Sequence, residues 1–379
     1  MSTRTSNGPG IATRVFGSQW FVSVLAVLIA FAIGAILIAL SGASVVDAYY
    51  AMFRGSIVDP NAANAVRMIK PLTDSLFYSI PLIISGLGLE LGFRAGLFNI
   101  GGKGQIIVGA LAAVWVGFAV SLPPVVHTLV ALLVAVIAGG LYGGIAGVLK
   151  AKTGANEVIV TIMLNSIATL GLGYTLAQKA WQVPGTNQPV TPKVADSAAF
   201  ARLLPAPFKL HVGFLVALVA LVAFWWLIER STLGFQIRAV GANAAAARTA
   251  GISVERITAI TMVLSGAFLG LAGANEALGT IGYVSRDVAG SIGFDAITVA
   301  LLGRNKTWGT FGAGLLFGAF KAGGYTMQAK GVPIDMILIL QSVIVLLIAA
   351  PALVRWLFRL PDVRALAANT RKGNADEHK

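Results

Sequence analysis

Apolar stretches of about twenty residues recur along almost the whole chain, with polar segments between them. A helix needs about 20 mainly apolar residues to cross the hydrocarbon core of a bilayer, and it satisfies its own backbone hydrogen bonds there. The sequence therefore predicts an all-α, polytopic membrane protein. Its eighth apolar segment is short enough to be a half-helix. We expect ten crossings, over residues 20–41, 74–93, 104–120, 125–148, 157–179, 212–228, 257–279, 293–303, 308–326 and 335–354.

The charged residues and the rare residue types limit the kinds of site and partner that this protein can have. Only 11% of the 379 residues are charged, against about 25% in soluble domains. There is no cysteine and the three histidines are scattered, so we expect no disulfide, no metal site and no cofactor. The net charge of +13 would suggest nucleic-acid binding by a soluble protein. In a membrane protein, basic cytoplasmic loops explain this charge better, so we expect no nucleic-acid partner.

The distribution of lysine and arginine predicts the orientation. Alternate loops on one side hold roughly twice as many of these residues as the loops on the other side. We therefore expect a cytoplasmic segment at 1–19, a transmembrane domain at 20–354 and a basic cytoplasmic tail at 355–379. The first apolar run is too long for a cleaved signal peptide. The largest external loop, 180–211, is rich in proline, and we expect it to be ordered over the mouth of the protein.

A polar stretch, FRAGLFNIGGKGQ at 93–105, separates two of the apolar segments. It is not a nucleotide-binding P-loop, because Gly102-Lys103 is followed by glycine where that motif needs serine or threonine. The sequence also contains no Ser/His/Asp set and no paired carboxylates, so we expect no catalytic residues and no ATP hydrolysis by this chain. Two interpretations stay open: a cytoplasmic turn, or a break between helices that lines a pathway.

The pathway interpretation depends on polar groups between and inside the spans. Glycines at 101, 102 and 104 would interrupt a helix and leave backbone groups facing a cavity. Ionisable groups inside membrane helices are costly and often functional. Glu276 and Lys321 lie deep in their segments, where they could neutralise each other or line the path. We assign the substrate pathway to Phe98, Asn99, Gln105, Asn165, Glu276 and Lys321.

The long cytoplasmic loop at 231–257, STLGFQIRAVGANAAAARTAGISVERI, has a helical centre. AAAAR has high helix propensity, Asn243 can cap the helix, and Gly251 can end it. Such a helix either links two spans or docks a cytoplasmic partner. The detailed pattern of Gly, Asn, Ala and Arg favours docking.

Residues 139–167 and 312–344 resemble each other. Each has a helix with small residues every four positions, a short polar break, and a similar start to the next helix. With the two breaks on opposite sides, the pattern predicts inverted repeats, although glycine-rich helices alone can produce it. The stripe of Gly139, Gly143 and Gly147 also predicts close helix packing.

Several motifs, in one order over roughly residues 70–350, resemble the permease subunits of ABC importers. They are ELGFRAGLFNIGGKGQIIVGAL, TGANEVIVTIMLN, STLGFQIRAVGANAAAARTAGIS, GAFLGLAGANEALG and GFDAITVALLGRNKTWGTFGAGLLFGAFKAGG. The chain is most similar to the branched-chain amino acid/ribose-type superfamily, and within it to nucleoside and simple-sugar permeases. FNIGGKGQ matches a family segment like FNIGAEGQ, with Lys103 in place of the usual acidic residue. Any role of that carboxylate therefore does not transfer.

The resemblance implies a function and partners. Such a permease lies in the bacterial plasma membrane, in contact with lipid, and forms a pore with a second permease, expected to be a heterodimer. A separate cytoplasmic ATPase hydrolyses ATP, and an external binding lipoprotein delivers a nucleoside or a related small solute. The matching residues of the coupling helix are Gly241, Asn243, Ala247, Arg248, Gly251 and Ile252.

Other functions remain as alternatives. Within the importer class, the solute could be a simple sugar or a branched-chain amino acid. An ion-coupled secondary transporter would use Glu276 or Asp295 as its coupling site, but it needs no docking loop. A membrane scaffold would not need polar groups buried in several spans.

Overall fold

The fold is helical in a computed structural model that describes residues 19–333 and, beyond them, 336, 338–339, 342–343 and 346–347. Two compact units divide the chain, Met52–Thr326 and the remainder, Met1–Ala51 with Met327–Lys379. In the smaller unit, α2 (Gln19–Leu40) is followed by α3 (Val45–Ser56), which continues into the larger unit. The Tyr49 hydroxyl of α3 donates to the Phe31 carbonyl of α2.

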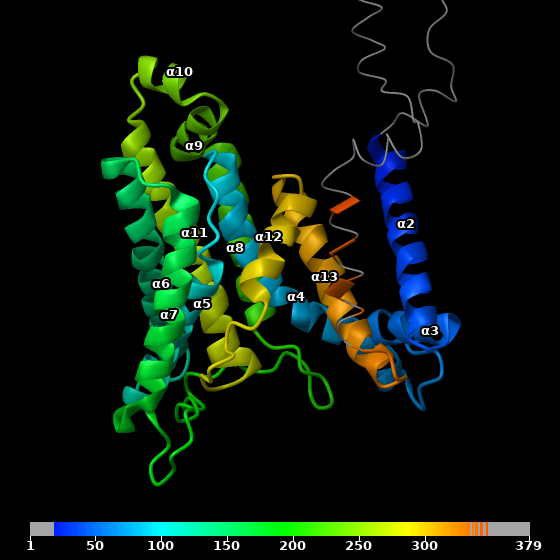
Figure 1. Cartoon of the computed structure of the whole chain (residues 1–379). Coiled ribbons are helices and arrows are strands. Elements are labelled where there is room, and N and C mark those ends of the chain that lie inside the picture. Colours follow the sequence, from blue (N-terminus) through cyan, green and yellow to red (C-terminus); the bar gives the residue numbers. More distant parts are fainter. Residues whose placement is uncertain (1–18, 334–335, 337, 340–341, 344–345, 348–379) are drawn as a thin grey trace, which may run out of the picture. The chain divides into compact units, whose positions relative to one another are not determined.

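The larger unit carries the elements used below (Figure 1). Among the described residues the only extended pairing is one isolated bridge, so the predicted all-α class is confirmed for that part of the chain. A 3₁₀ turn η1 (Lys179–Trp181) follows α7, and a π-helical turn η2 (Glu276–Thr280) continues α11. The helices are α4 (Ala65–Arg94), α5 (Gly102–Ala119), α6 (Val126–Thr153), α7 (Glu157–Ala177), α8 (Gly213–Arg230), α9 (Thr232–Ala242), α10 (Ala244–Thr249), α11 (Val254–Asn275), α12 (Ile292–Leu302) and α13 (Thr307–Gln328).

The helices agree with most of the predicted crossings but do not confirm the number ten. In the described part, six helices are long and apolar enough to cross a membrane: α4, α5, α6, α7, α8 and α11 with η2. The predicted half-helix is α12, whose 11 residues span about 16 Å at 1.5 Å per residue. The segment predicted at 335–354 lies largely outside the described residues.

Two features of the helices were not predicted. Helix α4 begins at Ala65, nine residues before the expected start at 74, because Asn64 accepts the backbone N–H of Arg67 as an N-cap. Helix α9 occupies the first part of the loop at 231–257, and its cap is Ser231, which accepts from Gly234 N at 2.9 Å. Both starts follow from side-chain caps that hydropathy alone does not register.

The core of the larger unit forms where α11 lies against α5 and α6 (Figure 1). A Cβ atom on Gly139 would lie 2.5 Å from the carbonyl oxygen of Gly266. One on Gly273 would lie 2.1 Å from the carbonyl oxygen of Ile106. These distances are too short for any side chain, so the predicted glycine stripes are the surfaces that let the helices approach.

The proline-rich loop 180–211 is ordered, as predicted. Its backbone N–H groups bond to the segment after α11: Thr191 N to Val284 O at 3.0 Å, and Phe200 N to Leu278 O at 2.9 Å. Ala195 N also donates to Gly117 O at the end of α5. The loop is therefore fixed over one end of α5 and α11, at the end of α8 opposite to α9 and α10.

Candidate functional site

The break between α4 and α5 runs over residues 95–101 and turns back into the bundle (Figure 1). Gly96 adopts φ +72°, a left-handed conformation that favours glycine. Further along, the amide of Asn99 donates to Ser265 Oγ at 2.9 Å. Ser265 lies 11 residues beyond Val254, about 16 Å along α11. The segment is thus re-entrant rather than a surface turn. Gly102 and Gly104, expected to break the helix, instead lie inside α5.

The side-chain amides of three predicted pathway residues, here called the amide network, brace this break, although Asn165 bonds to the backbone and not to the other two. Asn99 and Gln105 exchange side-chain hydrogen bonds of 3.0 and 3.2 Å. Asn165 accepts from Gly104 N and donates to Ile100 O, both at 2.8 Å. All three amides are buried. Their hydrogen bonds therefore satisfy backbone groups that the missing helical turn would otherwise leave unpaired.

Phe98 lies outside the amide network, although it is next to Asn99 in the chain. The residue is 37% exposed, and its ring packs on Phe93 with 5.0 Å between centroids. The apolar ring is thus available on the surface of the break.

Glu276 and Lys321 come together in a second polar cluster, far along the chain from the first. Glu276 is buried in the π-helical turn η2 and accepts from Thr280 Oγ1 at 3.1 Å. Lys321 on α13 interacts electrostatically with both Glu276 and Asp295, and its Nζ lies 6.0 Å from the ring centroid of Tyr78. One cation thus faces two carboxylates and an aromatic ring, within a turn type that is frequent at functional sites.

A cavity of about 390 Å³, here called the distal cavity, adjoins this cluster. Its volume suits a small organic solute. Flat aromatic faces, hydroxyl and imidazole groups, and two basic side chains surround it. It is lined by Phe77, Tyr78, Phe200, Arg202, Lys209, His211, Gly279 and Thr280.

His211 is the most unusual group of the distal cavity. It is 2% exposed, and its Nδ1 accepts from Gly213 N at 3.1 Å, so the neutral ring carries its proton on Nε2. Within the described structure, Nε2 has no hydrogen-bond partner. A polar atom that is buried beside a cavity and lacks a partner is an open position for a bound polar group. Burial lowers the pKa of His211 from 6.5 to about 4.

We expect this buried imidazole to make the protein less stable in acid. Above pH 6.5 the ring is neutral whether the chain is folded or unfolded, so its contribution is constant. Between pH 6.5 and about 4 only the unfolded chain binds the proton, so stability falls as the pH falls, by about 3 kcal/mol in total. Thermal unfolding of the purified protein from pH 7.5 to 4.5 measures this loss. His211→Gln should flatten the curve, and parallel curves for the variant and the wild type would contradict the assignment.

The six predicted coupling residues lie together at the opposite end of α8. Asn243 caps α10 by accepting from Ala246 N at 3.0 Å, and Gly251 follows the helix with φ +83°, both as predicted. Ala247 is the buried residue of α10, and its carbonyl accepts from Ile252 N at 3.0 Å. Arg248 pairs with Glu255. The result is a compact helical knob whose other residues face outward.

Gly241 joins this knob to the re-entrant segment. A Cβ on Gly241 would lie 2.0 Å from the carbonyl oxygen of Arg94, and one on Gly96 would lie 3.5 Å from Gly241 Cα. The end of α9 therefore touches the end of α4 directly. The two stretches that looked separate in the sequence, 93–105 and 231–257, are in contact.

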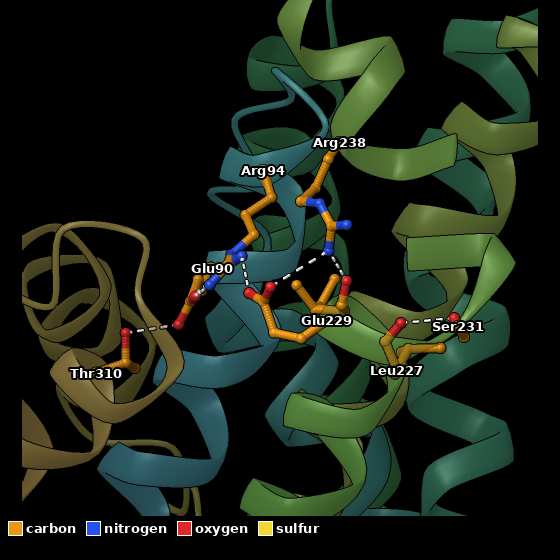
Figure 2. Close-up of polar contacts among 8 residues, drawn as sticks. Glu90, Arg94, Leu227, Glu229, Ser231, Arg238 and Thr310 are labelled. Atoms are coloured by element: carbon orange, nitrogen blue, oxygen red, sulfur yellow. Dashed lines mark hydrogen bonds and ion pairs between the residues drawn. The ribbon is translucent and has the colours of Figure 1, made fainter. Parts of the chain in front are cut away.

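Four charged residues around this contact form a network that the sequence analysis missed (Figure 2). Glu90, which is 0% exposed, accepts from Thr310 of α13 at 2.7 Å and pairs with Arg94 at 2.7 Å. Arg94 also pairs with Glu229 of α8 at 2.8 Å, and Glu229 lies 3.6 Å from Arg238 of α9. The network links α4, α8, α9 and α13. The four-residue spacing of Glu90 and Arg94 at a helix end was the one signal in the sequence.

Comparison with known proteins identifies the family. The family described as "Branched-chain amino acid transport system / permease component" matches residues 72–349. The guanosine ABC transporter permease NupP of Bacillus subtilis (strain 168) is 39% identical over 349 residues, which are 89% of this chain and 95% of the relative. The glucose ABC transporter permease TsgB13 of Haloferax volcanii is 35% identical over 333 residues, 85% of each chain.

A third relative and the solved structures complete the comparison. The nucleoside ABC transporter permease NupB of Lactococcus lactis is 31% identical over 359 residues, 92% of this chain and 95% of the relative. No solved structure matches the chain. The family match covers the re-entrant segment, both polar clusters and the α9–α10 knob, and the chain therefore belongs to the branched-chain amino acid transport permease family of ABC transporter membrane subunits.

Proposed function

We propose that this chain is the membrane subunit of an ABC importer that carries a nucleoside. The observation that carries the proposal is the 39% identity to a guanosine permease over 89% of the chain. The distal cavity supports it, because aromatic rings can stack on a base while hydroxyl and imidazole groups bond to a sugar. The pore-forming subunit is not an enzyme in this scheme, and ATP hydrolysis takes place in a separate ATPase subunit.

We propose that the assembly has four kinds of component. A second permease completes the pore, and a heterodimer is supported by two different guanosine permeases, NupP and NupQ, in one Bacillus strain. An ATPase binds the cytoplasmic knob of α10, and a lipid-anchored binding protein delivers the solute outside. Both termini then lie in the cytoplasm of a bacterium, and the distal cavity faces outward.

The solute path in this proposal has two parts. The distal cavity, Glu276 and Lys321 form its outer part, where a neutral or polar solute first meets the protein. Phe98, with the amides of Asn99, Gln105 and Asn165 behind it, shapes the deeper part at the re-entrant break. Movement of α9 and α10 reaches that break through the Gly241–Arg94 contact.

Uptake measurements test this function. The chain is co-expressed with its neighbouring ATPase, second permease and binding protein in a strain that lacks nucleoside uptake. Saturable accumulation of radiolabelled guanosine, unaffected by excess glucose or leucine and lost when the ATPase is inactivated, is the expected result. Glu276→Gln and Lys321→Gln should lower uptake, whereas Lys152→Gln, at an exposed position on α6, should not.

Other outcomes assign a different function. Competition by glucose instead of nucleosides would support the sugar alternative, which the 35% identity to a glucose permease favours. Competition by leucine would indicate an amino acid. Uptake that survives inactivation of the ATPase but collapses with the ion gradient would overturn the importer proposal.

A further inference from the structure

A basic pocket of about 790 Å³ lies at the end of α8 that leads into α9. Its lining includes four cationic side chains, Arg94, Arg230, Arg304 and Lys306, and one carboxylate, that of Glu229. Arg94 already pairs with Glu229 and Glu90. In the described part of the chain, Arg230 and Lys306 form no ion pair. The pocket therefore presents a net positive charge.

The loop between α12 and α13 lines this pocket, and its backbone is strained. Arg304 adopts φ +54°, in the left-handed region that most residues other than glycine adopt at a cost of about 1–3 kcal/mol. Asn305 follows at φ +53°, a conformation that asparagine tolerates more readily. Thr307, which follows them, is buried, and within the described structure its Oγ1 has no hydrogen-bond partner. Strained backbone and an unpartnered hydroxyl beside surplus cations are expected of a binding site for an anion.

An apolar groove of about 780 Å³ adjoins the basic pocket, and Trp225 lines both. The groove is formed by Leu218, Val219, Val222, Ala223 and Trp226 of α8 with Phe268 of α11. From Leu218 to Leu227 it runs about 14 Å along α8, which is close to the half-thickness of a bilayer core of about 30 Å.

The residue types where the two hollows join are typical of the level where a membrane meets water. Arg230 is the last residue of α8, and its guanidinium lies 5.4 Å from the ring centroid of Trp225. Tryptophan and basic residues occupy this level in membrane proteins, and there they contact lipid headgroups. The groove thus lies where an acyl chain would run, and the cations lie where its headgroup would be.

We propose that the groove and the basic pocket together bind one anionic glycerophospholipid. Its acyl chain occupies the groove along α8, and its phosphate is held by Arg230 and Lys306. Because the pocket also contains Arg94 and Glu229, the bound lipid stands next to the contact between α4 and α9. The inference does not depend on which solute the protein carries.

Native mass spectrometry tests the headgroup. The protein is purified from membranes with the subunits that accompany it, and phosphatidylglycerol or phosphatidylcholine is added. We expect phosphatidylglycerol to bind preferentially, and Arg230→Gln with Lys306→Gln to weaken that binding about tenfold to thirtyfold. The control, Lys152→Gln with Lys179→Gln, removes the same charge from two exposed positions and should bind normally. Equal binding by the two double variants, or equal affinity for both lipids, would overturn the proposal.

Photo-crosslinking tests the groove without altering the cations. A photoreactive residue at the exposed position Ala223 should form adducts with lipid in the assembled protein. A crosslink to a second permease or another protein instead would show that a helix occupies the groove, and would also overturn the proposal. This arm remains decisive if the double charge variant fails to assemble.

Discussion

Replacement of Arg94 by methionine is expected to destabilise the protein by about 3–5 kcal/mol. The Glu90 carboxylate is 0% exposed, and its cationic partner is Arg94, which bonds to it through Nε at 2.8 Å and Nη2 at 2.7 Å. Without Arg94, the Thr310 hydroxyl alone would offset the charge of Glu90. A buried carboxylate without a cation is far less favourable than either the intact pair or no charge at all.

The effect should be reversible by a second substitution. Glu90→Gln combined with Arg94→Met removes both charges, and we expect it to recover most of the lost stability, as measured by thermal unfolding of the purified protein. Glu90→Gln alone should cost less, because Arg94 keeps its pair with Glu229.

A more exposed ion pair provides the matched control. Lys150 and Glu157 join α6 to α7 at 2.9 Å, and the Lys150 side chain is 35% exposed. Water solvates such a lysine, so Lys150→Met should cost about 1 kcal/mol or less. If Arg94→Met were no more harmful than Lys150→Met, the Glu90 pair would not stabilise the fold.

Replacement of Gly241 by alanine is expected to abolish transport, although alanine is the better helix former. The gain in helix propensity is about 1 kcal/mol. Against it, the new Cβ would lie 2.0 Å from Arg94 O and 2.9 Å from Ala95 C. These are backbone atoms at the end of α4 and cannot rotate away, so α9 must shift as a body. Uptake should fall at least about tenfold, since even a misplacement of about 1 Å can cost a hundredfold in function.

Alanine at a glycine without close neighbours provides the control. It distinguishes the steric clash at Gly241 from a general effect of replacing glycine by alanine. A Cβ on Gly171 of α7 meets nothing within 4 Å, so Gly171→Ala should leave uptake unchanged. Membrane levels of both variants, measured by immunoblotting, show whether lost uptake reflects lost protein. Normal uptake by Gly241→Ala would mean that α9 does not need its close approach to α4.

Much of the helical framework could be predicted from the sequence, because its causes are local. Apolar length alone located α5, α7 and α12 to within a few residues. Asn243 and Gly251 defined α10 correctly, since caps depend on residues three or four positions away. The same local chemistry at Ser231 and Asn64 begins α9 and lengthens α4, two features that apolar length alone does not predict. The internal repeat stays a prediction, because 312–344 extends beyond the fully described residues.

The candidate site was predictable only in part. The structure brings the amides of Asn99, Gln105 and Asn165 together around the break, and their role in a substrate pathway stays a prediction. The hydrogen bonds of Asn165 to backbone groups of the break could not be predicted from the sequence, because they join residues that are far apart in the chain. The place of His211 beside the distal cavity could not be predicted, because its burial depends on loop 180–211 folding against the segment after α11.

The sequence by itself determined that this chain is a helical membrane protein with a capped helix within residues 231–257. The length of an apolar stretch and a side-chain cap both depend on residues that are close together in the chain. Both can therefore be recognised in the amino-acid sequence. Tertiary structure alone decided that Glu90 meets Thr310, 220 residues away, and that Gly241 touches Arg94. It also decided that Trp225 joins a basic pocket to an apolar groove. Such contacts depend on how distant helices approach, and the glycine surfaces on α5, α6 and α11 set that approach only once the bundle has assembled.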